Sequence, residues 1–446
     1  MTRNSLPTSF IKEIDACENL QIFGTFPDRK RYSRDFYDYS PILMRLLNDC
    51  CADLVVRPSS IEAVMLVASA CNRYRIPLTL RGSGTGNYGQ CVPLEGGVVM
   101  LMNAINQIRK FDLTTGDVVV EPGCLLANLD NYLLKRGRQL KLLPSTWRTA
   151  SVGGFIAGGS GGIGSVSWGF LRDPGHLLGL EVVTIESSPK KLQLDSDFSK
   201  PLNHAYGTNG IITALRLSTA SSVTWHEVII DCKEWFKAVQ LLQNCATACK
   251  TLFLCTLLER RIIENLPTWS GESNGNHRLL LLVGSDEISK LEEQSQTFGA
   301  DFSYLGVEKT SNGNGLRELS WNHTTLHMRS KDPNWTYLQM LLPQPEIGAM
   351  NDLSKKWNDS ILWHLEVVRQ EGVHRIAALP IVRWVNENVL EELMNDCRAI
   401  GAVLFNPHVV TVEDGGLGVV DVDQVNAKKK YDPNGLLNPG KLKGWN

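Results

Sequence analysis

The sequence lacks the signatures of membrane, secreted and nucleic-acid-binding proteins. No stretch approaches the roughly 18 consecutive apolar residues that a membrane-spanning helix needs, and residues 1–10 contain no apolar run of the kind found in a secretory signal. The formal net charge of the 446-residue chain is -2, and its longest block of one sign is Lys428-Lys429-Lys430. We therefore expect a cytoplasmic protein without a nucleic-acid partner or a membrane span.

The sequence also lacks the common metal-binding patterns. Eleven cysteines are scattered from Cys17 to Cys397, but no pair of CxxC motifs occurs, so a structural zinc site is not expected. The HExxH pattern of metalloproteases and the Walker A motif are both absent. Buried, reduced thiols of a cytoplasmic protein explain the cysteines, and no metal site is predicted.

What the chain does contain divides it into four segments. Residues 1–48 are expected to form a helical lead-in, residues 49–222 a first domain, residues 223–410 a second domain and residues 411–446 a loop-rich tail. At about 150 residues per domain, the length accommodates two or three domains. In the first domain, short apolar runs between turn residues predict strands at 54–56, 78–80, 98–102, 118–120, 180–185 and 211–217. Apolar spacing predicts helices from residue 61 and at 125–135.

The second domain differs from the first in the order of its expected strands and helices. Residues 227–302 alternate as strand, helix, strand, strand, helix and strand, an order that predicts a ferredoxin-like α+β layer. A second and looser round of the same kind is expected between residues 336 and 405, with a helix at 390–400.

The sharpest local feature is a glycine-rich loop that follows the strand at 78–80, namely Arg81-Gly82-Ser83-Gly84-Thr85-Gly86-Asn87-Tyr88-Gly89. Glycines let successive backbone N–H groups turn toward one anion, because no Cβ blocks the approach. Four hydrogen bonds to a charged group would supply about 6–12 kcal/mol. The loop formally matches GxGxxG, but Pro93 and Gly96-Gly97 lead into another strand where a Rossmann fold requires a helix.

A second glycine-rich segment spans residues 151–164. Seven of the twelve positions 153–164 are glycine, which argues against an ordinary helix because each glycine costs about 1 kcal/mol there. The apolar residues Phe155, Ile156 and Ile163 argue against a flexible linker. Backbone packed closely against a flat ligand and purely structural turns both remain compatible with this composition.

Taken in order, these segments resemble the FAD-binding domain of the vanillyl-alcohol oxidase superfamily, also called the PCMH-type fold. The layout is most similar to the branch of the glycolate oxidase flavin subunit and D-lactate dehydrogenase. Nine ordered segments, covering about 175 residues and the tail, carry the resemblance: residues 57–64, 77–89, 93–99, 120–123, 143–145, 151–154, 172–183, 207–213 and 431–441. The fold class it implies is α+β, with a two-lobed PCMH-type domain and a ferredoxin-like cap over the substrate.

The resemblance also implies which residues hold FAD. The first loop would cradle the pyrophosphate through Gly82, Ser83, Gly84, Thr85 and Gly86, flanked by Arg81 and Asn87. The residues that would line the flavin are Pro144, Ser145, Gly153, Gly154 and Ser160, and those near the adenine and ribose are Gly210 and Ile212.

The chain departs from the family pattern in three places. Many relatives tether the flavin through a histidine of the first loop, but residues 81–89 contain neither His nor Cys, so we predict non-covalent FAD. The His–Gly–Asp–Gly–Asn–Leu–His element that helps to build a metal site in this branch is missing near residues 373–378, and Glu413-Asp414-Gly415-Gly416 replaces Gly–Glu–His–Gly before the tail. The substrate is therefore a 2-hydroxy acid or a larger alcohol.

Candidate catalytic residues come from the second domain. His323 and His327 would share one face of a helix, one turn apart, and either could act as a base that removes a proton from the substrate; two structural histidines are the alternative. Arg369, Arg375 and Arg383 are possible carboxylate ligands, although each is more typical of a surface ion pair.

We therefore predict an FAD-dependent dehydrogenase or oxidase that takes hydride from a CH–OH group of a small-molecule substrate. Oxygen, a quinone and a protein are equally compatible as the electron acceptor. A flavin-binding electron-relay or assembly subunit without its own turnover is the alternative, and a degenerate scaffold without flavin is a third reading. The long second domain favours an enzyme, because a relay needs no enclosed substrate site.

Overall fold

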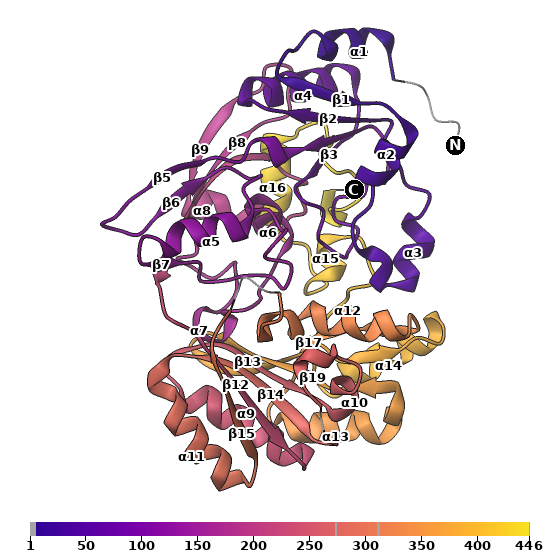
Figure 1. Ribbon diagram of the computed structural model, residues 1–446. Helices are drawn as coiled ribbons and strands as arrows, with labels where there is room; N and C mark the ends of the chain where they lie inside the picture. Colours follow the sequence, from indigo (N-terminus) through magenta and orange to yellow (C-terminus); the bar gives the residue numbers. More distant parts are fainter. Residues whose placement is uncertain (1–5, 273, 310–312, 446) are drawn as a thin grey trace.

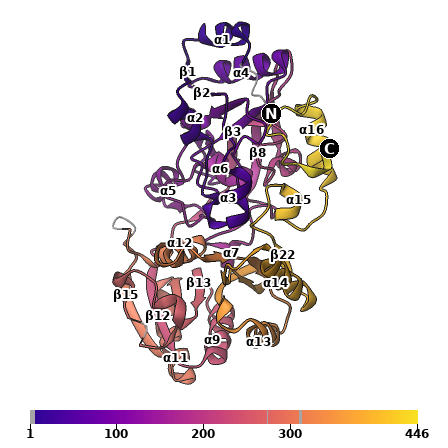
Figure 2. The same cartoon turned by 90° about the vertical axis from the view of Figure 1, so that its right-hand side faces the viewer.

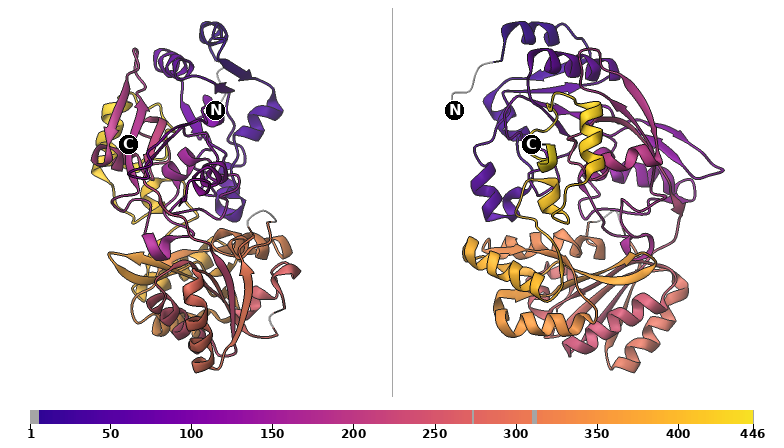
Figure 3. Two further views of the ribbon diagram at one scale, coloured as in Figure 1. Left: turned by 60° about the vertical axis from the view of Figure 1, so that its left-hand side comes forward. Right: turned by 180° about the vertical axis from the view of Figure 1, so that it is seen from behind.

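The computed structural model describes residues 6–272, 274–309 and 313–445. The chain forms an upper part that contains two sheets and a lower part built on one large sheet (Figure 1). The upper part itself has two lobes, which stand side by side in the left view of Figure 3. This arrangement confirms the predicted α+β fold class.

The first lobe is a four-stranded sheet in the order β1-β2-β4-β3, in which β2 and β3 run parallel to β4. Its strands are β1 (Leu20–Phe23), β2 (Leu54–Pro58), β3 (Leu78–Arg81) and β4 (Val98–Leu101). Its helices are α1 (Thr8–Asp15), α2 (Phe26–Tyr32), α3 (Pro41–Leu47) and α4 (Ile61–Tyr74). The N-terminal segment is thus not helical throughout, because β1 pairs with β2.

Helix α4 begins where its sequence predicts. The Ser60 hydroxyl accepts a hydrogen bond from the Ala63 N–H at 3.2 Å, which satisfies one of the free N–H groups of the first turn. The helix ends at Tyr74, and the next residue, Arg75, has a left-handed φ of 56°. Its buried face, which includes Val64, Val67 and Ala68, packs in the same apolar cluster as Met100 of β4.

The second lobe is a five-stranded antiparallel sheet in the order β5-β6-β10-β8-β9. Its strands are β5 (Ile108–Phe111), β6 (Val118–Val120), β8 (Leu177–Val183), β9 (Lys191–Asp195) and β10 (Ile211–Leu217), and a small ribbon pairs β7 (Arg138–Gln139) with β11 (Ala220–Ser221). Its helices are α5 (Leu126–Leu134), α6 (Val152–Gly158) and α8 (Ser196–Ser199). The short helix α7 (Ser165–Trp168) leaves this lobe and packs on the lower part, where Val166 joins the apolar cluster of the large sheet.

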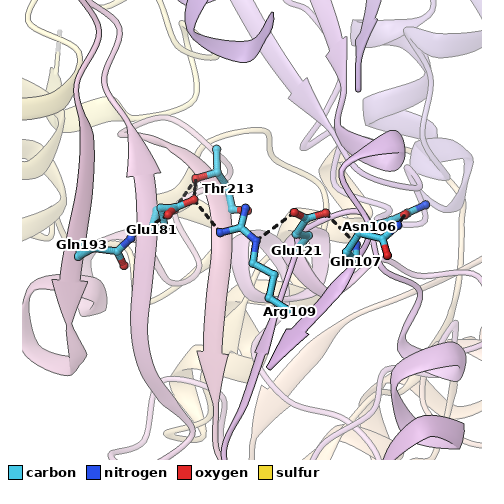
Figure 4. A network of polar contacts seen from close by, with 7 residues as sticks. All are labelled: Asn106, Gln107, Arg109, Glu121, Glu181, Gln193 and Thr213. Carbon is cyan, nitrogen blue, oxygen red and sulfur yellow. Dashed lines mark hydrogen bonds and ion pairs between the residues drawn. The ribbon is translucent and has the colours of Figure 1, made fainter. Parts of the chain in front are cut away.

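A polar network crosses one face of this sheet (Figure 4). Arg109 of β5 pairs with Glu121 at 3.0 Å and with Glu181 of β8 at 2.9 Å. The other Glu181 oxygen accepts a bond from Gln193 of β9 at 2.7 Å, and Thr213 of β10 bonds to Glu181 at 3.0 Å. An antiparallel sheet can present one polar face in this way while its other face packs on the core.

The lower part consists of two copies of the strand–helix–strand–strand–helix–strand unit. The first copy contains β12 (His226–Cys232), α9 (Trp235–Ala248), β13 (Leu252–Leu258), β14 (His277–Val283), α11 (Ile288–Phe298) and β15 (Asp301–Val307). The second contains β17 (Gln339–Leu341), α13 (Glu346–Trp357), β19 (His364–Gln370), β20 (Val373–Ala378), α14 (Glu387–Ala399) and β22 (Val403–Phe405).

The two copies join into one eight-stranded sheet in the order β15-β12-β14-β13-β19-β20-β17-β22. Each half has the strand order of a ferredoxin-like layer, and the halves meet where β13 pairs with β19. One apolar cluster contains buried residues of α9, α11, α13 and α14, so these helices cover the same face. The opposite face carries α12 (Asn322–Lys331), which lies toward the upper part (Figure 1). Smaller elements are α10 (Arg260–Ile263), β16 (Trp335–Tyr337), β18 (Ile361–Leu362) and β21 (Ile381–Arg383).

The C-terminal tail returns to the upper part (Figure 2). It contains α15 (Val412–Gly415) and α16 (Val422–Tyr431). The Leu78 N–H of β3 donates to the Leu436 carbonyl at 2.8 Å, and the Asn438 N–H donates to the Leu78 carbonyl at 2.8 Å. The tail therefore adds a backbone contact beside the strand that delivers the first glycine loop.

Candidate functional site

A cavity of about 470 Å³ lies between the upper and lower parts. That volume falls in the usual range of ligand sites. All fourteen residues predicted to bind the cofactor line it, namely Arg81, Gly82, Ser83, Gly84, Thr85, Gly86, Asn87, Pro144, Ser145, Gly153, Gly154, Ser160, Gly210 and Ile212. The structure thus brings together segments that are more than 100 residues apart in the sequence.

The first glycine loop leaves its backbone donors free. Strand β3 ends at Arg81, and Gly84 then takes a φ of 72°, which a residue with a Cβ rarely adopts. The Gly86 carbonyl accepts from the Phe36 N–H at 2.8 Å, which fixes the loop against the N-terminal segment. Within the described part of the chain, the N–H groups of residues 83–86 donate to no protein acceptor. Free donors on successive residues are what an anion such as a diphosphate requires.

Buried charges lie directly beside this loop. Arg81 donates to the Arg34 carbonyl at 2.5 Å and to Cys91 Sγ at 3.1 Å. Lys441, from the tail, donates to the Gly89 carbonyl and to the Val92 carbonyl. Burial lowers the pKa of Lys441 to about 8. Burial also raises the pKa of Asp35 to about 6, while the charges of Lys441 and Arg81 oppose that rise. Two cations facing one acid leave a positive excess near the loop.

The second glycine segment is partly helical, which corrects the expectation from its composition. Helix α6 spans Val152–Gly158, and the Ser151 hydroxyl accepts from the Gly154 N–H at 3.3 Å. A Cβ on Gly153 would lie 2.4 Å from Pro122 Cβ, and one on Gly162 would lie 2.2 Å from the Leu143 carbonyl oxygen. Close backbone packing therefore requires these glycines, and at Gly153 it outweighs the cost of a glycine to the seven-residue helix. The same segment also lines the cavity.

The lower part closes the cavity with a group of polar and aromatic side chains near the start of α12. Trp321, Asn322, His323 and Leu326 line it, together with Glu318. Trp321 has a φ of 51°, which is strained for a bulky residue. Its N–H donates to Glu366 at 2.8 Å, and that fully buried carboxylate also contacts His364 at 2.8 Å.

Glu318 connects the two parts of the molecule. One of its oxygens accepts from Arg148 Nε of the upper part at 2.8 Å, and the other lies 3.3 Å from His323 Nδ1. These hydrogen bonds and the nearby charges outweigh burial and lower the pKa of the Glu318 carboxyl. An ionised Glu318 that faces Nδ1 favours the ring tautomer with its proton on that nitrogen and its acceptor at Nε2.

The two predicted histidines have different positions. His323 lines the cavity, whereas His327 is not among the lining residues. His327 Nε2 lies 2.8 Å from the Glu318 carbonyl oxygen, and burial lowers the pKa of its ring.

The three arginines considered as carboxylate ligands also lie outside the lining. Arg369 contacts the Ser167 carbonyl, Arg375 contacts the Leu342 carbonyl, and Arg383 pairs with Asp332.

Sequence reasoning missed several residues of the cavity. Phe36 and Tyr39 reach it from the N-terminal segment, Arg148 from the turn after Pro144, and Glu318 and Gln339 from the lower part. The side chains of Arg148 and Glu318 meet across 170 positions of sequence. No spacing rule links such residues. The one signal in the sequence that could have pointed to these residues was the carboxylate of Glu318, which precedes the candidate base His323 by five residues.

The residues of the cavity fit FAD. The first loop offers four free N–H groups, and Arg81 and Lys441 supply positive charge close to it. Apolar and small residues, among them Pro122, Pro144 and Ala150, offer surface for a flat ring system. Among the residues that the structure describes, no three His, Cys, Asp or Glu side chains gather as a metal site would require. No helix in the described ranges is long and apolar enough to cross a membrane.

Comparisons with known proteins agree with this reading. The profile of a family described as an FAD binding domain matches residues 52–189. The chain is 31% identical over 437 residues to glycolate oxidase subunit GlcD of Bacillus subtilis. The alignment covers 87% of this chain and 88% of that protein. It is 22% identical over 422 residues to D-lactate dehydrogenase of Archaeoglobus fulgidus, covering 87% of this chain and 91% of that protein.

A solved structure of alkyldihydroxyacetonephosphate synthase superposes with a TM-score of 0.75, over 99% of this chain and 86% of that one. At 16% sequence identity, this similarity shows the fold alone. The near full-length match to a relative that is 31% identical carries the assignment. The chain belongs to the PCMH-type family of FAD-binding oxidoreductases, in the branch of the glycolate oxidase flavin subunit and D-lactate dehydrogenase.

Proposed function

We propose that this protein oxidises the CH–OH group of a 2-hydroxy acid or a related alcohol, using FAD held without a covalent bond. The observation that carries the proposal is the shared cavity, which the glycine loops line from one side and Glu318, Trp321 and His323 line from the other. In this proposal residues 49–222 and the tail 411–446 hold FAD, and residues 223–410 close over the substrate. When bound, FAD supplies the hydride acceptor.

His323 is the proposed base of the reaction. Its Nε2 accepts the proton of the substrate hydroxyl, because Glu318 already engages Nδ1. The positive charge that develops on the ring is stabilised by the Glu318 carboxylate. His327 acts from outside the cavity through its contact with the Glu318 backbone. Its proposed role is to keep Glu318 in position.

Non-covalent binding is supported by the side chains near the first loop. Residues 81–89 contain neither His nor Cys. Burial raises the pKa of the thiol of Cys91, which also lines the cavity, and so disfavours the reactive thiolate. We expect acid precipitation to release all the flavin into the supernatant. Flavin retained in the pellet would contradict this part of the proposal.

The relatives support the choice of substrate class, since they are called glycolate oxidase, D-lactate dehydrogenase and D-2-hydroxyglutarate dehydrogenase. No disulfide joins the eleven cysteines, all of which lie in the described ranges, and this is consistent with a reducing compartment such as the cytoplasm. The electron acceptor is proposed to be oxygen, a quinone or a protein.

The direct test is to mix the FAD-loaded protein under argon with glycolate, D-lactate or D-2-hydroxyglutarate and to follow the visible absorbance of the flavin. Bleaching by at least one of these acids is the expected result. Bound flavin that none of the acids or a panel of larger alcohols bleaches would contradict the proposal and would favour an electron-relay or assembly subunit.

A further inference from the structure

The backbone of Arg148 is held by hydrogen bonds of the surrounding turn, and its guanidinium group has N–H donors that are not used within the described part of the chain. It lies in a turn where the Trp147 N–H donates to the Pro144 carbonyl at 3.0 Å and the Ala150 N–H donates to the Thr146 carbonyl at 2.9 Å. The Trp147 carbonyl accepts from the Ala127 N–H of α5 at 3.2 Å, which ties the turn to a helix. The position of Arg148 is therefore set by the flavin domain and not by a mobile loop.

The guanidinium is held from two sides. Its Cζ lies 4.5 Å from the centre of the Trp147 ring, and Trp147 is itself buried. Its Nε donates to Glu318 at 2.8 Å. This cation–π contact and one charged hydrogen bond together restrain the guanidinium group. The side chain keeps about a third of its surface exposed and lines the cavity.

The two terminal nitrogens of Arg148 are unused. Within the described part of the chain, this side chain makes one hydrogen bond, from Nε to Glu318, and its terminal nitrogens donate to no acceptor. Among the described residues that line the cavity, Arg81 is the other cation, and it already donates to the Arg34 carbonyl and to Cys91. A paired set of free N–H groups on a planar cation is the geometry that binds a carboxylate in bidentate fashion.

We propose that Arg148 binds the carboxylate of the substrate and thereby selects acids that carry this group next to the CH–OH carbon. This inference rests on the proposed function, since it names the group that the substrate presents. Glu318 bonds to Arg148 through one oxygen and faces His323 through the other. Glu318 therefore sets the position of the terminal nitrogens of Arg148 relative to the ring of His323, the proposed base. A 2-hydroxy acid has its carboxylate and its hydroxyl on neighbouring carbons, so it is the class of acid that a cation and a base held by one carboxylate would bind together.

The test compares D-lactate with its uncharged amide, D-lactamide, in which an NH2 group replaces one carboxylate oxygen, on the full-length FAD-loaded protein. Flavin bleaching under argon gives the half-saturating concentration of each. For Arg148→Met we expect the value for D-lactate to rise about tenfold to a hundredfold, as for loss of hydrogen bonds to a charged group, and the value for D-lactamide to stay within about threefold. Arg148→Lys should recover only part of the loss, because an ammonium group lacks the planar fork.

Arg216→Met is the matched control. Arg216 makes an ion pair with Asp117 at 2.6 Å and does not line the cavity, so this variant should behave like the wild type. Equal effects of Arg148→Met on D-lactate and D-lactamide, or no effect on either, would overturn the inference. Arg148→Met must also retain FAD and leave the flavin reduction potential unchanged; a shifted potential would assign Arg148 to the flavin and overturn its role toward the substrate.

A second measurement separates this inference from the proposed function. Oxalate presents carboxylates but cannot be oxidised at a CH–OH group, and its binding is followed by the change that it causes in the flavin spectrum. Should no hydroxy acid bleach the wild type, the proposed function fails, and oxalate still decides the role of Arg148. Oxalate binding that is lost in Arg148→Met supports the carboxylate site. Oxalate that binds both proteins equally, or does not bind the wild type, overturns it.

Discussion

Replacing Gly84 with alanine tests whether the first loop must keep its observed shape to bind FAD. The φ of Gly84 is 72°, and a residue with a Cβ loses about 1–2 kcal/mol in that region. The new Cβ would also lie 2.1 Å from a terminal nitrogen of Arg81. Arg81 would have to leave the Arg34 carbonyl, and the loss of such a charged hydrogen bond costs about 1.5–3 kcal/mol. The sum is about 2.5–5 kcal/mol.

The free protein can relieve this strain by relaxing the loop, whereas the FAD complex cannot. The penalty should therefore appear in the Kd for FAD, which we expect to rise about a hundredfold to several thousandfold. Calorimetric titration of the apoprotein with FAD measures it. Gly137→Ala is the matched control, because Gly137 has a φ of 70° with no atom within 4 Å of the added Cβ; it should lower the Tm but leave the Kd unchanged. A folded Gly84→Ala protein with a Kd within about threefold of the wild type would refute the reasoning.

Three further predictions concern the base, its partner and the buried lysine. His323→Gln should slow flavin bleaching by about a hundredfold or more while FAD binding is retained, and His327→Gln, outside the cavity, should slow it far less; equal losses would contradict the assignment of the base. Glu318→Gln should slow bleaching about tenfold or more, since a neutral amide stabilises a protonated imidazole poorly, and a wild-type rate in this variant would contradict the proposed pairing. Burial lowers the pKa of Lys441 to about 8 from an ordinary value of 10.5. Between these two pH values the unfolded chain binds more protons at this residue than the folded chain does. The contribution of Lys441 to the free energy of unfolding therefore rises with pH in that window. Urea unfolding at both ends of that window should show a smaller rise for Lys441→Met than for the wild type and for Lys429→Met, an exposed control; an identical rise in all three would contradict the buried position of Lys441.

The parts of the site that rest on local backbone geometry were predictable from the sequence. Glycines at Gly82, Gly84 and Gly86, placed directly after a strand, signal a loop with free N–H groups wherever they occur. The strand–helix alternation of residues 227–302 likewise predicts the ferredoxin-like half of the lower sheet, because it depends on periodicity within short windows.

The substrate side of the cavity was not predictable in the same way. Arg148 and Glu318 meet only because the lower part folds back over the turn after Pro144, and no local pattern encodes such an encounter. The composition of residues 153–164 argued against a helix, but tight packing of Gly153 against Pro122 overrides helix propensity in α6. Strand β1 has only four residues and lies between two helices in the sequence, so its local pattern did not reveal it. It forms because it pairs with β2 at the edge of the sheet.

The central claim is that the free N–H groups of residues 83–86 bind the diphosphate of FAD. A crystal structure of the FAD complex tests it most directly. We expect diphosphate oxygens within hydrogen-bonding distance, about 2.7–3.2 Å, of at least two of these nitrogens, with the ring system extending toward His323. A dinucleotide bound elsewhere, or a diphosphate held by side chains while these N–H groups stay unengaged, would contradict the account.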